Sequence, residues 1–376
     1  MMSQTHPHAS AREDLGLMLV GLSGGVDSAV AALCLLHQGY RVEGLFMKNW
    51  EEDDQPGYCA AAKDLATAEA VAKHLDIPLY RINFAADYWE GVFETFLAEY
   101  RAGRTPNPDV LCNREIKFKA FLDHALDLGA TAIATGHYAD IVQDENGYHL
   151  WSAADTNKDQ TYFLHLLDQR ALAHSRFPLA HLTKTEVRDL ASAAGLPNHA
   201  RKDSTGLCFI GERRFDSFLA RFLEPQPGPI ETPEGKCLGE HRGLMFHTLG
   251  QRHGLGLGGR HGGLEAPWYV AAKVLSRNAL VVVQGHDHPL LFHRGLVASH
   301  LHWVSGRSPA IMPLFCQARL RHRQPLQDCH VVVWDDELTC QVSFNIPQRA
   351  VAPGQAVVFY HCGECLGGAT IERAID

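Results

Sequence analysis

The sequence lacks several features that define whole classes of protein. No apolar run in its 376 residues approaches the ~20 residues that a membrane-spanning helix needs, so we expect no association with a membrane. The first 14 residues contain no apolar signal-peptide core, and the ten cysteines lack the spacing of a secreted disulfide framework. These absences predict a cytoplasmic protein whose cysteines are mostly reduced.

Patterns for resident metal ions are also missing. The 23 histidines show no metal-ligand spacing, and the single Cys-x-x-Cys at Cys362 and Cys365 supplies half of the ligands of a tetrahedral zinc site. We therefore expect no tightly bound metal and no organic cofactor. The sequence also has no Gly-rich segment that ends in Gly-Lys-Ser/Thr, so the common P-loop for ATP is excluded.

The net charge of −9 argues against general affinity for nucleic acid, but the charge is unevenly distributed. Residues 1–100 contain 15 acidic and 6 basic residues, whereas the remaining 276 residues contain 28 of each sign. Basic clusters occur at 201–202, 213–214 and 319–323. Such clusters can bind phosphates locally, although each one taken alone is equally well explained as a solvated surface.

The order of apolar segments predicts an α/β protein. Strand and helix patterns alternate over residues 17–138, and short strands separated by turns follow from residue 268. This order is typical of a doubly wound parallel sheet followed by a small linking domain and a C-terminal β-barrel. The expected units are a disordered extension (1–16), a catalytic domain (17–224), a linking domain (225–288) and the barrel (289–376), with a boundary near the Pro-rich segment 225–229.

In the parallel sheet we expect strands at 17–20, 41–47, 79–84 and 131–135. Helices are expected at 29–36, 60–75, 87–102 and 113–128. Ligands of such sheets bind where the strands end. The segments 21–28, 47–50 and 136–138 each follow a strand and should meet at that edge.

The segment after the first strand indicates a phosphate-binding turn. It consists of Gly21, Leu22, Ser23, Gly24, Gly25, Val26, Asp27 and Ser28. Glycines allow the backbone to approach an anion, and the following helix contributes its positive N-terminal end. The hydroxyls of Ser23 and Ser28 can donate hydrogen bonds to phosphate, and Asp27 can hold Mg²⁺ or cap the helix.

Two further loops each carry a cysteine in a setting that favours thiolate. Cys112 follows Asn107, Pro108 and Asp109 at the expected start of a helix, and Cys208 lies between two pairs of basic residues. A helix N-terminus or nearby cations lower the pKa of a thiol. Either cysteine alone could equally be a small buried apolar residue, and Asp109 could simply cap the helix.

With these three segments together, the chain resembles the bacterial tRNA-specific 2-thiouridylases of the PP-loop ATP pyrophosphatase superfamily. The resemblance extends from residue 17 to the C-terminus. Its further motifs are 44–50, 102–109, 134–138, 157–160, 203–211, 247–252 and 365–368. It implies an N-terminal domain like that of the adenine nucleotide α-hydrolases, with ATP and Mg²⁺ as cofactors and a uridine of tRNA as substrate.

For the reaction, the resemblance implies that ATP converts the uracil O2 into an adenylate and that sulfur then displaces AMP. The turn 21–28 would hold the phosphates, with Asp27 as a magnesium ligand, while Met47 and Gly136 contact the adenosine. Cys208 would carry a persulfide, and Cys112 would resolve it by forming a disulfide with Cys208. Asp109 would be the general acid or base.

For the partners, the resemblance implies the anticodon stem-loop of tRNAs for Lys, Glu and Gln. Asn107, Pro108 and Asp109 would hold the flipped-out wobble uridine, and Lys158, Asp159 and Gln160 would form a second contact. Arg321 and His322 would form a third, with His322 where the family is expected to have tyrosine. A persulfide carrier protein or a cysteine desulfurase would supply the sulfur to an enzyme expected to be a monomer.

Two other functions fit parts of the sequence. A PP-loop synthetase that adenylates a small-molecule carbonyl for amine transfer would explain the turn but leave Cys112 and Cys208 without roles. A non-catalytic RNA-binding protein would leave the intact Ser23 and Asp27 unexplained. The tRNA-modifying enzyme accounts for all of these residues.

Overall fold

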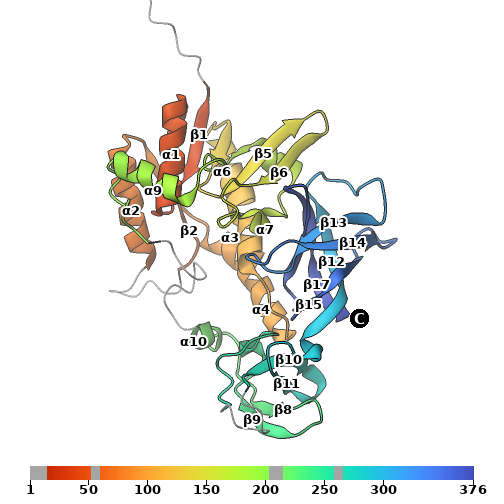
Figure 1. Cartoon of the computed structure of the whole chain (residues 1–376). Coiled ribbons are helices and arrows are strands. Elements are labelled where there is room, and N and C mark those ends of the chain that lie inside the picture. The colour runs from red at the N-terminus through yellow and green to blue at the C-terminus, as the bar shows by residue number, and fades with distance from the viewer. Residues whose placement is uncertain (1–14, 52–59, 203–214, 258–265) are drawn as a thin grey trace, which may run out of the picture.

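The computed structural model describes residues 15–51, 60–202, 215–257 and 266–376, whose strands form three sheets (Figure 1). A five-stranded sheet comes first in the chain, a four-stranded sheet lies in the middle, and an eight-stranded sheet contains the C-terminal strands. The segment around Cys208 and most of the expected extension 1–16 lie outside the described residues.

The first sheet is parallel throughout and has the order β3-β2-β1-β4-β7. Its strands are β1 (Leu17–Gly21), β2 (Arg41–Lys48), β3 (Leu79–Asn83), β4 (Ala132–Ala134) and β7 (Ser175–Arg176). The chain reverses direction across the sheet between β1 and β4. Because loops diverge at such a point, the carboxyl ends of β1 and β4 leave a crevice open for a ligand.

Helices cover both faces of this sheet. Along β1, Leu17 and Leu19 belong to one hydrophobic cluster and Met18 and Val20 to the other. One face packs against α1 (Val26–Gln38), α2 (Ala60–His74) and α9 (Lys184–Ala193). The other face packs against two longer helical segments, 85–101 and 108–127. The expectation of a doubly wound parallel sheet is confirmed.

Both longer helical segments contain a π-helical stretch. The first consists of α3 (Ala85–Tyr88), a π-helix (Trp89–Phe93) and α4 (Glu94–Arg101). The second consists of α5 (Pro108–Leu111), a π-helix (Cys112–Ala120) and α6 (Phe121–Asp127). A π-helical turn inside an α-helix frequently accompanies a functional site.

The helix that carries Cys112 begins five residues earlier than the sequence predicted. Asn107 is its N-cap and accepts a hydrogen bond from the backbone N–H of Asp109 at 3.2 Å, and Pro108 occupies the first helical position. Cys112 therefore lies beyond the first turn, where the helix dipole has largely faded. The expectation that Asp109 could be the cap is wrong.

The middle sheet has the order β10-β11-β8-β9. Its strands are β8 (Gly228–Glu231), β9 (Cys237–His241), β10 (Trp268–Val274) and β11 (Ala279–Gln284). Short helices connect the larger elements: α7 (Thr161–Leu164), α8 (Gln169–Ala173), α10 (Phe215–Leu219) and the 3₁₀ turns Leu244–Phe246, Leu275–Arg277 and Pro289–Leu291.

The C-terminal strands close into a barrel of six. They are β12 (Phe292–Trp303), β13 (Leu314–Arg319), β14 (Gln327–Val333), β15 (Cys340–Arg349), β16 (Ala356–His361) and β17 (Glu364–Ile375). They pair in the order β12-β15-β14-β13-β16-β17, and the pairing of β12 with β17 closes the ring. This confirms the expected barrel.

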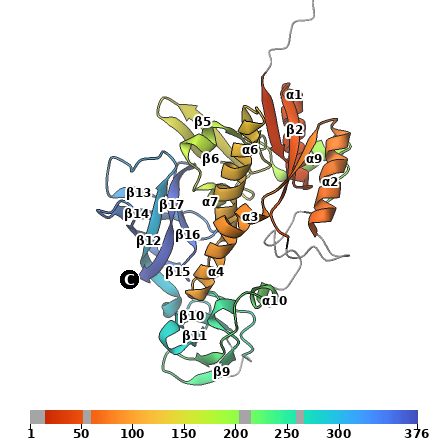
Figure 2. The same ribbon diagram turned by 180° about the vertical axis from the view of Figure 1, so that it is seen from behind.

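A hairpin from the N-terminal half extends the barrel sheet, which the sequence did not predict. Its strands are β5 (Ala139–Asp144) and β6 (Gly147–Ser152), and β6 pairs with the start of β17 (Figure 2). Barrel residues such as Tyr360 and Cys365 also share a hydrophobic cluster with the helices of the first domain. The barrel is thus connected to the N-terminal domain both by strand pairing and by a shared hydrophobic cluster.

No helix in the described segments combines the length and the apolar character needed to cross a membrane.

Candidate functional site

The turn after β1 has the geometry of an anion cradle. Gly24 has φ +78°, and a Cβ there would lie 2.6 Å from the backbone oxygen of Asp64, so only glycine fits. The hydroxyl of Ser28 donates to the Gly25 carbonyl at 3.1 Å and accepts from the N–H of Ser23 at 3.2 Å. These bonds fold the turn tightly onto the first residues of α1.

Two residues far along the chain support this turn from outside. Asn198 Nδ2 lies 3.0 Å from the carbonyl oxygens of both Gly24 and Gly25, and Arg201 donates to Gly24 O at 3.2 Å while pairing with Asp64. The two carbonyls are thereby held by donors of the protein. No local sequence pattern marks Asn198, and Arg201 was recognised only as part of a basic cluster.

Gly136, just after the end of β4, lies against the other side of the phosphate-binding turn. A Cβ at Gly136 would lie 2.6 Å from Ser28 N and 2.7 Å from Asp27 C, so α1 approaches the strand end as closely as the backbone permits. Met47 lies nearby, because a Cβ on Gly21 would come 3.2 Å from its Cε. The three strand ends expected to meet therefore do so.

Asp27 does not have the surroundings of a ready-made magnesium ligand. Lys184 Nζ lies 2.6 Å from Asp27 Oδ1 and 2.8 Å from Oδ2, and the Tyr138 hydroxyl donates to Oδ1 at 3.0 Å. Both carboxylate oxygens are thus already engaged. Within the described segments, moreover, no group of three or more His, Cys, Asp or Glu side chains could hold a metal ion. The donor set does not fit a resident Mg²⁺.

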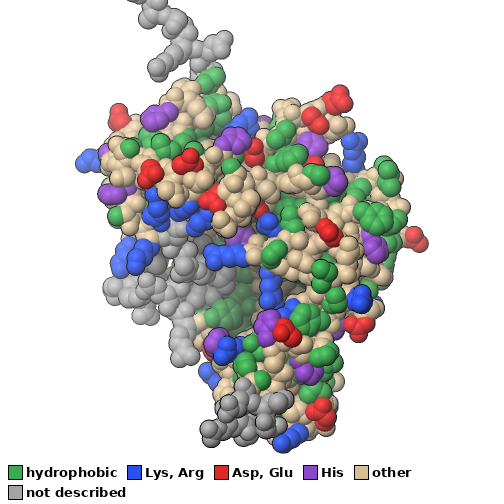
Figure 3. Space-filling view, in the orientation of Figure 1, with side chains coloured by type: hydrophobic (Ala, Val, Ile, Leu, Met, Phe, Trp, Pro, Cys, Tyr) green, Lys and Arg blue, Asp and Glu red, His purple; other side chains and the backbone are tan. Residues whose placement is uncertain are grey.

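These elements line a cavity of about 750 Å³ between the first domain and the barrel. Its described lining residues are Gly21, Ser23, Gly25, Val26, Asp27, Ser28, Met47, Lys117, Thr135, Gly136, His137, Tyr138, Asn157, Lys158, Gln160, Phe163, Lys202, His322 and Arg323. Four of these are Lys or Arg and one is acidic, and Figure 3 shows Lys and Arg side chains gathered around the hollowed middle of this face. The cavity suits a large polyanion despite the negative total charge of the chain.

Asp109, in the first turn of the π-interrupted helix, interacts electrostatically with Lys117 and His322, which line this cavity. Burial raises the pKa of its carboxyl group, and the positive charges of Lys117 and His322 partly oppose that effect. A raised pKa favours the protonated form of a carboxyl group, which can then donate a proton. Cys112 is buried one turn further along the same helix.

Lys117 is oriented by a buried histidine. Its ammonium lies 3.4 Å from His137 Nε2, and His137 Nδ1 lies 2.8 Å from the hydroxyl of Thr135. Burial, with the charge of Lys117 second, lowers the pKa of His137 well below its usual value. His137 is therefore neutral and accepts a hydrogen bond from Lys117, which points the ammonium toward the cavity. The sequence did not identify Lys117.

The segment 158–160 is divided between the cavity and the protein interior. Lys158 and Gln160 line the cavity, and Gln160 accepts a hydrogen bond from the N–H of Tyr138. Asp159 is buried and forms an ion pair with Arg319 of the barrel at 3.1 Å. Asp159 as a tRNA contact stays a prediction, and its carboxylate is engaged inside the protein.

The side chains of the basic cluster in the barrel also point in different directions. His322 is half-buried, packs on Phe163 with ring centroids 4.6 Å apart, and lies 2.8 Å from the backbone oxygen of Asp159. Arg321 turns away and donates to the carbonyl of Ala350 at 3.1 Å, whereas Arg323 lines the cavity. Of the predicted pair, His322 faces the cavity; the basic residue beside it there is Arg323.

The second predicted cysteine cannot be placed, because Cys208 lies outside the described residues. The described chain stops at Lys202, which lines the cavity, and resumes at Phe215, which packs against Phe96 and Tyr100 of α4. The pairing of Cys112 with Cys208 stays a prediction.

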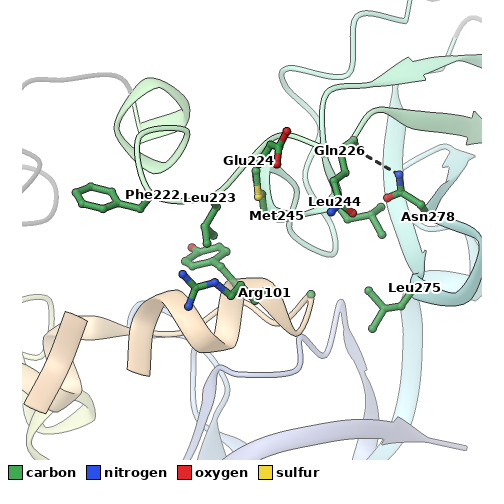
Figure 4. A pocket seen from close by; sticks show the side chains of 12 residues that line it. Arg101, Phe222, Leu223, Glu224, Gln226, Leu244, Met245, Leu275 and Asn278 are labelled. Carbon is green, nitrogen blue, oxygen red and sulfur yellow. Dashed lines mark hydrogen bonds between the residues drawn. The ribbon is translucent and has the colours of Figure 1, made fainter. Parts of the chain in front are cut away.

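A second cavity, of about 440 Å³, lies where the end of α4 meets the middle domain (Figure 4). Arg101, Leu275 and Asn278 are among its lining residues, and none of the predicted site residues reaches it. It contains no cluster of nucleophilic or titratable groups comparable to the first cavity, so we assign the candidate site to the first.

Comparison with known proteins identifies the family to which the chain is similar. Residues 17–212 match the tRNA methyl transferase HUP domain, residues 216–284 the tRNA methyl transferase PRC-barrel domain, and residues 293–371 the aminomethyltransferase β-barrel domain. Several curated proteins named tRNA-specific 2-thiouridylase MnmA are similar over nearly the whole chain.

The protein from Methylococcus capsulatus is 59% identical over 361 residues, which cover 96% of this chain and 97% of that protein. The protein from Alkalilimnicola ehrlichii is 59% identical over 94% of this chain and 97% of its own, and the protein from Vibrio cholerae is 55% identical over the full length of both. The domain descriptions mention methyl transfer, whereas these three relatives carry the thiouridylase name. The chain belongs to the tRNA-specific 2-thiouridylase family.

Proposed function

We propose that the protein is an ATP-dependent tRNA-uridine 2-sulfurtransferase. It would act on the wobble uridine of tRNAs for Lys, Glu and Gln. The observation that carries the proposal is the cavity in which the Gly21–Ser28 turn, four basic side chains and the Asp109 helix meet. Such a cavity can hold a nucleotide and an RNA base side by side. The names of the relatives support tRNA as the substrate.

In the first step, the turn and the basic side chains bind the phosphates of ATP. The uracil O2 attacks the α-phosphorus, and the bond to pyrophosphate breaks. The adenosine would lie near Met47 and Gly136, at the ends of β2 and β4. Magnesium would arrive with the phosphates of ATP.

In the second step, the terminal sulfur of a persulfide on Cys208 attacks C2, and AMP leaves. Cys112 then attacks Cys208, the sulfur–sulfur bond breaks, and the transferred sulfur stays on the base. A dithiol reductant reopens the resulting Cys112–Cys208 disulfide. Asp109 would move the proton at the base, a role that its raised pKa supports.

For the base, Asn107, Pro108 and Asp109 would contact the flipped uridine at the start of the helix. Flipping is inexpensive in a single-stranded anticodon loop. Lys158, Asp159 and Gln160 would contact the surrounding RNA, as would Arg321 and His322. Of these, Lys158, Gln160 and His322 line the cavity, together with the neighbouring Arg323. Sulfur would come from a persulfide carrier or a cysteine desulfurase, and the enzyme would act as a cytoplasmic monomer.

The experiment is mass spectrometry of nucleosides from unmodified tRNA after incubation with the protein, ATP and a persulfide donor. We expect 2-thiouridine only when ATP is present, and pyrophosphate release that tRNA stimulates. Asp27→Ala should block pyrophosphate release, because the loop loses the group that anchors Lys184 and Tyr138. Release that depends on a small metabolite and ignores tRNA would instead favour an amine-transferring PP-loop synthetase.

A further inference from the structure

The acidic residue of the phosphate-binding turn is paired with a lysine from a distant helix. Lys184 Nζ lies within hydrogen-bonding distance of both carboxylate oxygens of Asp27, at 2.6 and 2.8 Å. The Lys184 side chain is 13% exposed and that of Asp27 is 32% exposed. Asp27 lines the cavity, and the mostly buried Lys184 ammonium lies directly behind its carboxylate.

The backbone of Lys184 is held in place by its own helix. It is the first residue of α9, whose N-cap Thr183 forms a reciprocal capping box with Glu186. The N–H of Lys184 donates to Asp155 Oδ2 at 3.0 Å. The buried residues Val187 and Ala191 fix α9 in the same hydrophobic cluster as α1 (Figure 1). A lysine anchored in this way loses little further freedom when it binds a ligand.

The groups around Lys184 Nζ also stabilise its positive charge. The ring of Tyr138 lies 5.9 Å from Lys184 Nζ, and its hydroxyl donates to Asp27. Asp27 lies in the first turn of α1, next to the backbone of the turn that would receive the phosphates. The ammonium is therefore one carboxylate away from the expected position of the phosphates.

We propose that Lys184 is a nucleotide-binding residue: Asp27 holds its ammonium at the turn, where it offsets the carboxylate charge that would otherwise repel the phosphates, a part that a metal ion on Asp27 would otherwise play. This rests on the proposed use of ATP. As the bond between the α- and β-phosphates breaks, negative charge grows on the departing pyrophosphate, and a fixed ammonium stabilises it. The role of Asp27 is then to position Lys184.

The test is the affinity for ATP, measured by calorimetry once with EDTA and once with Mg²⁺. The wild-type protein should bind ATP in EDTA, and Lys184→Met should weaken that binding about tenfold or more, because the Asp27 carboxylate then faces the phosphates without its counter-charge. Lys184→Arg should restore most of the affinity. Lys119→Met is the matched control, because Lys119 pairs with Glu115 at 2.8 Å and is 64% exposed outside the cavity.

Three results would overturn the proposal. The first is wild-type affinity of Lys184→Met in EDTA, and the second is ATP binding by the wild type that requires Mg²⁺. The third is an Asp27→Asn variant that loses only the magnesium-dependent part of the affinity. A wild-type protein that binds ATP under neither condition would contradict the proposed function itself, which is a distinguishable outcome.

A measurement on the unmutated protein covers the case in which a Lys184 variant does not fold. Lysines are acetylated with a succinimidyl ester in EDTA, with and without ATP, and the modified peptides are quantified by mass spectrometry. ATP should slow the acetylation of Lys184 several-fold relative to that of Lys119. Equal rates at Lys184 with and without ATP would contradict the proposal.

Discussion

Asp159 and Arg319 form a buried ion pair that joins the N-terminal domain to the barrel. Asp159 Oδ2 and Arg319 NH1 are 3.1 Å apart, and the two side chains are 1% and 13% exposed. The hydroxyl of Thr161 donates to the same carboxylate, and the guanidinium lies 5.2 Å from the ring centre of Tyr360. The cavity wall that carries Lys158 and His322 is therefore built on this pair.

Asp159→Asn should destabilise the protein strongly. Removing one partner leaves a buried guanidinium without its counter-charge, which typically costs about 3–5 kcal/mol of unfolding free energy. The measurement is urea denaturation followed by circular dichroism. Asp123→Asn is the matched control: its pair with Arg170 is about half exposed, so its loss should cost less than about 1 kcal/mol. Equal costs for the two variants would mean that the buried pair is not a main link between the domains.

Gly136→Ala should impair nucleotide binding. The new Cβ would meet the backbone of Asp27 and Ser28 at 2.6–2.7 Å, so α1 and the phosphate-binding turn would have to shift. We expect the affinity for ATP to fall about tenfold or more in calorimetric titrations.

The matching control is Gly239→Ala in β9, where an added Cβ would have its nearest contact, at 3.4 Å, with the side chain of Leu257. This variant should bind ATP like the wild type. If Gly136→Ala bound ATP with full affinity, the close approach of β4 to α1 would not define the nucleotide site.

Buried neutral histidines predict that acid destabilises the protein. Burial lowers the pKa of both His165 and His247 to about 4. In the unfolded chain each titrates near its ordinary value of about 6.5, so between these values the unfolded state binds more protons than the folded state. Stability is therefore complete above about pH 6.5 and falls as the pH drops toward 4. Each of the two histidines should lower the free energy of unfolding by about 2 kcal/mol between pH 7.5 and pH 5.

Urea denaturation at pH 7.5 and at pH 5.0 checks this. His165→Asn should reduce the difference between the two unfolding free energies by about 2 kcal/mol. His181→Asn should leave the difference unchanged, because the His181 side chain is 83% exposed. A pH dependence that is the same in both variants would mean that His165 does not titrate differently on unfolding.

The sequence predicted those parts of the site that depend on local pattern. The turn 21–28 is recognisable because its glycines are required by backbone geometry, as the φ of +78° at Gly24 illustrates. The ends of β2 and β4 could be placed because parallel strands bring their carboxyl ends to one edge.

Residues that act through tertiary packing escaped prediction. Lys184 reaches Asp27 across 157 positions of sequence, and Asn198 reaches Gly24 across 174. Neither lies in a motif, and their positions depend on how α9 packs against α1. The start of the Cys112 helix was missed because a Pro-Asn-Pro sequence is typical of an extended chain. In the structure, Asn107 of this sequence is the N-cap of the helix. The strands β5 and β6 pair with each other locally, but the pairing of β6 with β17 joins residues more than 200 positions apart and could not be predicted from local pattern.

The last prediction concerns the two cysteines assigned to sulfur transfer. Cys112→Ser and Cys208→Ser should each abolish the formation of 2-thiouridine, because a hydroxyl can neither carry nor release a sulfane sulfur. Pyrophosphate release stimulated by tRNA should persist, since adenylation precedes sulfur transfer. Cys237→Ser and Cys362→Ser, at exposed cysteines, are the controls and should thiolate tRNA normally. A fully active Cys112→Ser enzyme would remove Cys112 from the mechanism, and its buried position on the π-helical segment would then be purely structural.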